Sequence, residues 1–188
     1  MECYVRLSYS DYLMRVEVAY RGALEKFILE HRLNEVFGPK EAPVGLVIQG
    51  GMYNTVIRAL QRLGLADIHG ASQVPIYVLN VTYPLISSEF LTFCAGKEQI
   101  LVIEEGQPEF IEQTLTTYLY RAGSTVKLHG KGMLPMAGEY TGQVMLDGLT
   151  AFLRQAAPDM LPAMVAFGRA AWGERGEIWV LADAVKKK

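Results

Sequence analysis

One stretch of the sequence, residues 99–109, constrains the fold more than any other. It reads Gln99-Ile-Leu-Val-Ile-Glu-Glu-Gly-Gln-Pro-Glu109. The unbroken apolar run from Ile100 to Ile103 is typical of a strand buried on both faces of a parallel sheet. Two carboxylates and a glycine end the run, and Pro108 suits the first position of a helix, where an N–H would have no partner. Glu109 adds negative charge that the helix dipole favours. The stretch predicts strand, polar turn and helix.

The same alternation of buried strand and amphipathic helix recurs along the chain. Strands are expected at residues 44–48, 76–79, 100–103 and 125–128. After each strand, apolar residues repeat at helical spacing, and Ser87 and Thr141 are expected to cap two of these helices. Connections this short force right-handed parallel crossovers. The sequence therefore predicts an α/β fold, a three-layer α/β/α sandwich with a mostly parallel sheet.

Further segments flank this predicted sandwich. A long helix is expected from about residue 11 to about Val36, where Gly38 and Pro39 stop it. Its apolar residues are expected to share one inward face: Leu13, Val16, Tyr20, Ala23, Leu24, Phe27 and Ile28. At the other end, prolines interrupt the pattern near residue 160, and residues 177–182 are expected to form a last strand, at an edge or in an arm.

Composition narrows the class of protein. The chain has 188 residues, of which 51% are hydrophobic and 20% charged, with a net charge of −2; this is typical of one globular domain with appendages. The absence of a basic stripe argues against a nucleic-acid partner, and no apolar run approaches the ~20 residues of a membrane helix. Cys3 and Cys94 lack disulfide or metal spacing, which indicates a reducing, cytoplasmic compartment. We expect Cys94 to behave as a small core hydrophobe.

The carboxyl ends of the predicted strands are all polar. Because parallel strands end at one edge of a sheet, and open α/β sheets bind ligands there, this edge is the candidate site. Its candidate interface or crevice residues are Gln49, Gly50, Gly51, Asn54, Tyr83, Glu104, Glu105, His129 and Lys131. No residue is assigned a catalytic, cofactor-binding or metal-binding role.

Several kinds of chemistry are not supported at this edge. The chain has no G-x-S-x-G nucleophile turn, and its three histidines have no metal-ligand spacing. Glu104 and Glu105 point in opposite directions on a strand, so a matched acid–base pair is not expected. The alternative is that one carboxylate faces the crevice and the other accepts a hydrogen bond from a neighbouring backbone or chain.

Two glycines, Gly50 and Gly51, separate the first predicted strand from its helix. They allow close backbone approach to a helix N-terminus, which is a feature of anion sites. They also allow tight strand-to-helix packing without any ligand. The complete G-x-G-x-x-G and P-loop patterns are missing, and the sequence leaves both interpretations open.

Four stretches together resemble a known family. They are residues 44–56 (Val-Gly-Leu-Val-Ile-Gln-Gly-Gly-Met-Tyr-Asn-Thr-Val), residues 77–85, residues 101–112 with Val-Ile-Glu-Glu-Gly-Gln-Pro-Glu-Phe-Ile-Glu, and His129-Gly-Lys131 with Gly138-Glu139. They are similar to the indolepyruvate:ferredoxin oxidoreductases, a group of the 2-oxoacid:ferredoxin oxidoreductases. The resemblance covers roughly residues 44–155 and corresponds to the middle domain of the large subunit, which is similar to the transketolase C-terminal domain.

The resemblance implies an activity for the parent enzyme and a role for this chain. Such enzymes oxidatively decarboxylate aryl-pyruvates to acyl-CoA with thiamine diphosphate, magnesium and [4Fe–4S] clusters, and ferredoxin and CoA are their partners. The chain lacks their Gly-Asp-Gly motif and cluster-ligating cysteine sets, so we expect the isolated chain to be inactive. The implied role is a non-catalytic structural and interface domain that contacts other domains or subunits, and a homodimer is compatible with it.

The resemblance also implies a division of the chain. Residues 1–43 are expected to form an N-terminal linker helix, residues 44–155 the transketolase C-terminal-like domain, and residues 156–188 a connecting segment. Two other hypotheses remain. One is a freestanding flavodoxin-like module that binds an anion or nucleotide at Gly50 and Gly51. The other is an interaction domain that docks through helix 11–36 and the segment from Trp172 to Trp179.

Overall fold

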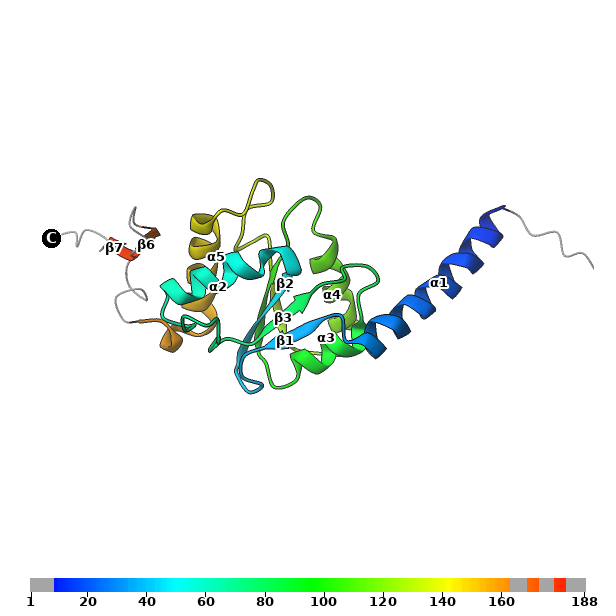
Figure 1. The fold of residues 1–188 in the computed structure, drawn as a ribbon, viewed down its shortest axis with the longest axis horizontal. Coiled ribbons are helices and arrows are strands. Elements are labelled where there is room, and N and C mark those ends of the chain that lie inside the picture. Colours follow the sequence, from blue (N-terminus) through cyan, green and yellow to red (C-terminus); the bar gives the residue numbers. More distant parts are fainter. Residues whose placement is uncertain (1–8, 163–168, 173–177, 182–188) are drawn as a thin grey trace, which may run out of the picture.

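The computed structural model describes residues 9–162, 169–172 and 178–181 and shows a central sheet between helices (Figure 1). Cys3 and residues 173–177, which include the first residue of the expected last strand, lie outside the described residues. The helices are α1 (Tyr9–His31), α2 (Tyr53–Arg62), α3 (Ser87–Cys94), α4 (Phe110–Arg121) and α5 (Gly142–Ala156). The strands are β1 (Glu35–Phe37), β2 (Val44–Gln49), β3 (Ile76–Leu79), β4 (Gln99–Ile103), β5 (Lys127–His129), β6 (Arg169–Trp172) and β7 (Ile178–Leu181). Short 3₁₀ turns occupy Gly50–Met52 and Pro158–Met160.

The main sheet has five strands in the order β1-β3-β2-β4-β5. Strands β2 to β5 are parallel, and β1 pairs antiparallel with β3 at one edge. In the centre of the sheet, Leu46 pairs with Ile76 on one side and with Leu101 on the other. The predicted α/β class with a mostly parallel sheet is therefore confirmed.

Helices cover both faces of this sheet (Figure 1). Leu46 and Ile48 of β2 pack into a core with α2 and α5, whereas Val47 between them packs into a core with α3 and α4. Successive side chains of a strand point to opposite faces, so an unbroken apolar run supplies both cores. This arrangement is the three-layer sandwich that the sequence predicted.

Several predicted helix ends differ from the structure. The Thr141 side chain caps α5 by accepting the N–H of Val144, as expected. Ser87 is not a cap, because the N-cap of α3 is Ile86 and no side chain bonds there. Pro108 lies before Glu109, the N-cap of α4, and not at the first helical position. The helical spacing after residue 109 would place Phe110 on the core side with Ile111, but Phe110 is 65% exposed because it begins α4 on the solvent side.

The N-terminal helix is shorter than predicted, because α1 ends at His31 and not near Val36. Arg32 has a positive φ of 48°, a conformation that L-residues rarely adopt, and it ends the helix. Residues 35–37 then form β1, an edge strand that the sequence reasoning missed.

The prediction that one face of α1 is buried is also largely wrong. Of the residues expected there, Ile28 is buried, whereas Val16, Tyr20, Ala23, Leu24 and Phe27 are exposed. The side chain of Leu13 lies outside the described residues. The C-terminal end of α1 packs on the sandwich, and Glu17 and Arg21 contact Tyr83, whereas the N-terminal part of the helix projects away (Figure 1). A helical period indicates that a face is apolar but does not say what covers it.

The structure also tests the predictions for β5, for Cys94 and for the last strand. Strand β5 begins two residues later than predicted and includes His129. Cys94 is buried, and burial raises the pKa of its thiol to about 12, as suits a core residue. The expected last strand is β7, which pairs antiparallel with β6 apart from the main sheet. Across the described residues, none of the helices combines the length and the apolar character of a membrane span.

Candidate functional site

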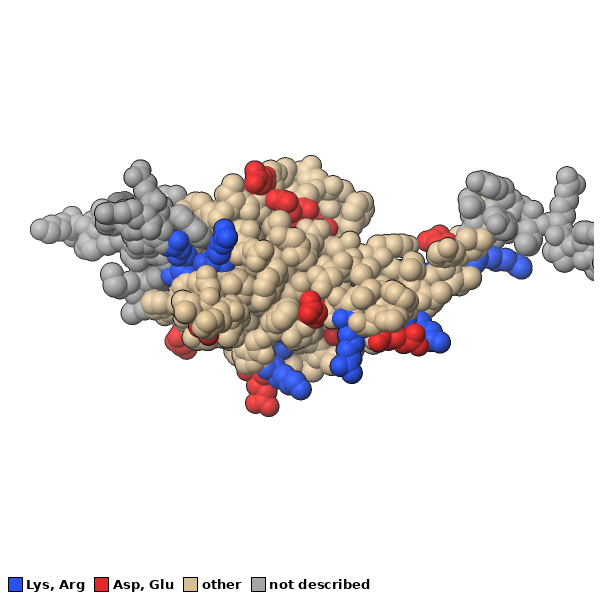
Figure 2. Space-filling view, in the orientation of Figure 1, with Lys and Arg blue, Asp and Glu red and all other residues tan. Residues whose placement is uncertain are grey.

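The carboxyl ends of β2, β3 and β4 lie at one edge of the sheet, as their parallel pairing requires. Four of the predicted site residues meet there through hydrogen bonds: Gln49, Glu104, Glu105 and Lys131. We call these four residues with Glu112 and Tyr140 the strand-tip network. Acidic and basic side chains are intermixed on the face in Figure 2, and most of that face carries neither.

Glu104 is buried, with 6% of its surface exposed, and its carboxylate faces the start of α4. Its oxygens accept the backbone N–H of Ile111 at 3.0 and 3.1 Å and of Glu112 at 3.2 Å. The first N–H groups of a helix have no partner within the helix, and a carboxylate there also matches the helix dipole. Glu104 therefore caps α4, a role that the side chain of the N-cap residue Glu109 does not fill.

Glu105 links the end of β4 to two neighbouring segments. Its backbone N–H donates to Oε1 of Gln49 at 2.9 Å, and its own Oε1 accepts the backbone N–H of Tyr140 at 2.6 Å. The sequence predicted a backbone hydrogen bond for one of the two adjacent carboxylates. In the structure both carboxylates accept backbone N–H groups, so both are engaged in holding loops.

Lys131 is the centre of the strand-tip network. Its ammonium donates to the backbone carbonyl of Glu104, to the carbonyl of Gly106 at 2.9 Å and to the hydroxyl of Tyr140 at 2.8 Å. Its backbone N–H donates to Oε2 of Glu112 at 3.0 Å. An ammonium has three N–H donors, and all three have partners here.

Tyr140 and Glu112 are the members of this network that the sequence reasoning missed. The hydroxyl of Tyr140 donates to the carbonyl of Pro135 at 2.7 Å while it accepts from Lys131. Tyr140 is 3% exposed and directly precedes the cap of α5. The sequence signal for Tyr140 is an aromatic residue beside the predicted helix cap Thr141. That signal indicates that Tyr140 is buried but does not identify its hydrogen-bond partner.

His129 belongs to the predicted edge but does not join the network. Its Nε2 lies 2.9 Å from Oε1 of Gln99, at the start of β4, and its ring packs 5.6 Å from that of Phe152. Burial, followed by the charge of Lys127, lowers the pKa of His129. The side chain therefore lies away from the strand tips.

The glycine pair after β2 has a packing role at its first position. A Cβ on Gly50 would lie 2.6 Å from Oδ1 of Asn80, closer than side chains approach, whereas Gly51 has open space. Asn80 in turn donates to the carbonyl of Leu33 at 2.9 Å, which connects β3 to the chain before β1. Asn54 is exposed on the first turn of α2, and no contact links it to the strand-tip network.

Tyr83 is the exposed member of the predicted edge, with 62% of its surface accessible. Its hydroxyl donates to Glu17 of α1 at 3.3 Å, and the guanidinium of Arg21 lies 5.6 Å from its ring centroid. Tyr83 and Phe110 line a cavity of about 470 Å³ beside Glu104 and Glu105. At this edge, the exposed rings of Tyr83 and Phe110 therefore lie beside the hydrogen-bonded carboxylates of Glu104 and Glu105.

The arrangement is better suited to holding loops than to acid–base chemistry. A general acid or base needs an oxygen or nitrogen free to exchange a proton with substrate, and the carboxylates of the strand-tip network already accept backbone donors. Among residues 9–162, 169–172 and 178–181, no group of three or more His, Cys, Asp and Glu side chains is placed to hold a metal ion.

Comparison with known proteins shows where the chain belongs. Residues 34–151 match the family model described as "Indolepyruvate oxidoreductase domain". Curated relatives are named "Indolepyruvate oxidoreductase subunit IorA". The Thermococcus kodakarensis protein is 30% identical over 125 residues, covering 66% of this chain and 18% of its own length. The Methanothermobacter marburgensis protein is 34% identical over 124 residues, covering 63% and 19%.

Among solved structures, a 2-oxoglutarate:ferredoxin oxidoreductase from Magnetococcus marinus is similar to the chain. It is 19% identical, with a TM-score of 0.46, and the match covers 78% of this chain and 24% of that one. The chain spans about one fifth of the length of the curated relatives it matches. Because the family model matches more than half of the 188 residues, the chain belongs to the indolepyruvate oxidoreductase domain family.

Proposed function

We propose that the chain is a non-catalytic structural and interface domain of a thiamine diphosphate-dependent indolepyruvate (2-oxoacid):ferredoxin oxidoreductase. The parent enzyme would oxidatively decarboxylate aryl-pyruvates to acyl-CoA, with ferredoxin and CoA as its partners. Thiamine diphosphate, magnesium and [4Fe–4S] clusters would be bound by its other domains or subunits. Membership of the family and the coverage of one fifth of the relatives support this proposal.

The observation that carries the proposal is the engagement of the strand-tip network in hydrogen bonds that hold the backbone of neighbouring loops. The carboxylates of Glu104 and Glu105 accept backbone N–H groups, and the Lys131 ammonium has three acceptors. These residues do not fit a diphosphate–magnesium group, because the three donors of the Lys131 ammonium already have acceptors and none is left for a phosphate oxygen. The chain also has no Gly-Asp-Gly motif. The network instead holds the β4–α4 and β5–α5 loops in place.

The proposed interface lies on the exposed aromatic side chains beside this network. Tyr83 and Phe110 are 62% and 65% exposed, and the neighbouring helix α1 exposes apolar residues such as Val18 at 70%. Clustered exposed apolar surface of this kind is typical of protein–protein contacts. We propose that other domains or subunits of the oxidoreductase cover it.

A chimera tests the non-catalytic role. Residues 34–151 would replace the corresponding segment of the Thermococcus kodakarensis IorA subunit, and the measured quantities are assembly by size exclusion and indolepyruvate-dependent reduction of ferredoxin. We expect the chimera to assemble and to retain turnover, because the exchanged segment supplies structure only. An assembled chimera with intact cofactors and no turnover would contradict the proposal.

A pair of substitutions in the same chimera tests the interface. Tyr83→Lys with Phe110→Lys should prevent assembly, because two charges would be desolvated at the contact. Tyr120→Lys is the matched control, since Tyr120 is 85% exposed at the other end of α4. Assembly that survives the double substitution would remove this edge from the interface.

A further inference from the structure

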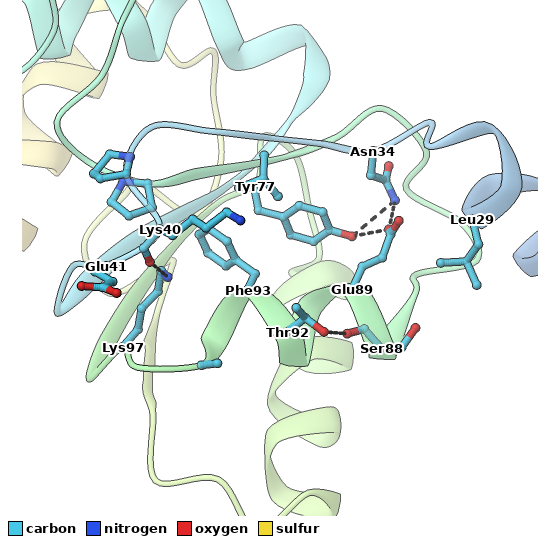
Figure 3. A pocket seen from close by; sticks show the side chains of 14 residues that line it. Leu29, Asn34, Lys40, Glu41, Tyr77, Ser88, Glu89, Thr92, Phe93 and Lys97 are labelled. Carbon is cyan, nitrogen blue, oxygen red and sulfur yellow. Dashed lines mark hydrogen bonds between the residues drawn. The ribbon is translucent and has the colours of Figure 1, made fainter.

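A second cavity, of about 680 Å³, lies between β1, the loop that follows it and α3 (Figure 3). It shares no lining residue with the cavity at the strand tips. Its volume falls within the range of about 300–1,000 Å³ that is usual for small-molecule sites. Neither the sequence reasoning nor the proposed function assigns it a role.

Glu89 marks one end of this cavity with a carboxylate held in a fixed position. Its Oε2 accepts the hydroxyl of Tyr77 at 2.9 Å and the side-chain amide of Asn34 at 3.0 Å. Tyr77 and Asn34 are themselves buried, at 1% and 7% exposure. Burial and the charge of Glu89 raise the pKa of Tyr77, which keeps its hydroxyl protonated and donating.

The charge of Glu89 is not compensated within the described part of the chain. Both of its hydrogen bonds come from neutral donors on Oε2, and no described donor bonds to Oε1. The ion pairs Arg21–Glu25 and Lys26–Glu30 both lie on α1, and neither involves Glu89. A carboxylate in a partly dry site gains most from a cation that also donates a hydrogen bond.

Lys97 marks the opposite end of the cavity with an ammonium. The residue is 8% exposed, and its Nζ lies 3.4 Å from the carbonyl of Lys40 and 4.5 Å from the ring centroid of Phe93. One long hydrogen bond leaves donors of the ammonium available. Lys40 and Glu41 line the same end, but no ion pair joins either to Lys97 within the described residues. Burial lowers the pKa of Lys97, as expected for a cation without a carboxylate partner.

The wall between these two ends is largely apolar, although the Lys40 side chain reaches along it in Figure 3. Figure 3 shows Phe93 between Lys97 and the cluster of Tyr77, Asn34 and Glu89. The rings of Phe93 and Tyr77 lie 5.6 Å apart, and Leu29 and Val36 line the same cavity. Glu89 lies within α3, whereas Lys97 follows the end of that helix, so a ligand that contacts both residues must extend past the ring of Phe93.

We propose that this cavity binds a small, elongated dipolar molecule. Its ammonium group would bind Glu89, its carboxylate would bind Lys97, and its apolar body would lie along Phe93. Each end of the ligand supplies the charge and the hydrogen-bonding partner that the protein group lacks. An α-amino acid is too short to extend past Phe93 to both ends, because its ammonium and carboxylate groups are bonded to the same carbon.

Titration of the full chain with 8-aminooctanoate tests this ligand class. Its ammonium and carboxylate groups are joined by seven methylene groups, a chain that can extend past the ring of Phe93. Methyl NMR signals of Leu29 and Val36 report binding in the wild-type protein without any substitution. We expect saturable shifts, and affinity at least about tenfold higher than for octylamine, octanoate or 3-aminopropanoate. The absence of saturable shifts, or equal binding of octanoate, would overturn the proposal.

Substitutions at the two ends test which groups bind the ligand. Glu89→Gln keeps the size of the side chain and an oxygen for Tyr77 and Asn34, and Lys97→Met keeps the length of the side chain. Each should weaken binding of 8-aminooctanoate by about tenfold or more. Glu98→Gln is the matched control, because Glu98 is exposed and does not line the cavity. Unchanged affinity in a folded Glu89→Gln variant would contradict the assignment.

Discussion

The carboxylate of Glu104 accepts the backbone N–H of Ile111, with its two oxygens at 3.0 and 3.1 Å from the nitrogen. The acid at the tip of β4 therefore caps the helix that follows it, across the loop from Glu105 to Glu109. The N-cap residue Glu109 makes no side-chain cap of its own. One side chain thus couples the end of the central strand to the start of α4.

Removal of this cap should destabilise the chain. Glu104→Ala leaves the buried N–H of Ile111 without an acceptor, which we expect to lower the free energy of unfolding by about 1–3 kcal/mol. Glu104→Gln retains one acceptor oxygen and should cost about half as much. Urea unfolding followed by circular dichroism measures both values. Glu98→Gln is the exposed control, and an equal loss there would argue against a specific cap.

Loss of the Lys131 ammonium should loosen both loops at the strand tips. Lys131→Met leaves the carbonyls of Glu104 and Gly106 and the hydroxyl of Tyr140 with one donor fewer. We expect a loss of about 1–3 kcal/mol in unfolding free energy and faster amide exchange at Tyr140. Lys127→Met, at an exposed site of β5, is the control. Exchange at Tyr140 that stays at the wild-type rate would show that the ammonium does not hold this loop.

Gly130 should tolerate no side chain. A Cβ at this position would overlap the carboxylate of Glu112, whereas a Cβ on Gly132 would meet open space. Gly130→Ala displaces Glu112 from the N–H of Lys131 and should lower the melting temperature, at a cost of about 1–3 kcal/mol. Gly132→Ala should change stability by less than about 0.5 kcal/mol. If the two alanine variants melt together, the close packing of Gly130 against Glu112 is not realised in solution.

The pH dependence of stability should include a contribution from His129. Burial lowers its folded pKa below the unfolded value, so the folded state prefers the neutral ring. The stabilisation is complete above the unfolded pKa of about 6.5, and it is lost as the pH falls through the folded pKa. Urea unfolding between neutral and mildly acidic pH measures the slope. His129→Gln should reduce it, and an NMR titration of the ring that gives a pKa at or above the unfolded value would contradict the prediction.

The sequence predicted the layered core well because burial of this kind is a local property. The run from Ile100 to Ile103 and the apolar spacing of α2 and α5 identify buried surfaces without knowledge of their partners. The same reasoning failed for α1, because most of its apolar residues are exposed and Ile28 is buried. It also missed β1, because three residues after a helix carry too little periodicity to indicate a strand.

The candidate site was predicted in part. The sequence indicated that Gln49, Glu104, Glu105 and Lys131 lie at one edge, because the carboxyl ends of parallel strands share that edge. It also placed His129 there, but the side chain turns toward Gln99. Alternation along a strand gives the face of a residue, whereas the direction of a side chain at a strand end depends on the loop that follows.

By itself, the sequence determined the fold class, the buried strands, the helix faces of the sandwich and the family. The tertiary structure alone decided which polar groups meet. Lys131 bonds a carbonyl 27 residues away, and Tyr140 bonds a carboxylate 35 residues away. The cluster of Asn34, Tyr77 and Glu89 likewise joins three separate segments. Hydrophobic burial can be predicted from the local periodicity of apolar residues. A hydrogen bond instead requires two atoms about 3 Å apart. Strand order and loop paths set that distance, and neither is a local property of the sequence.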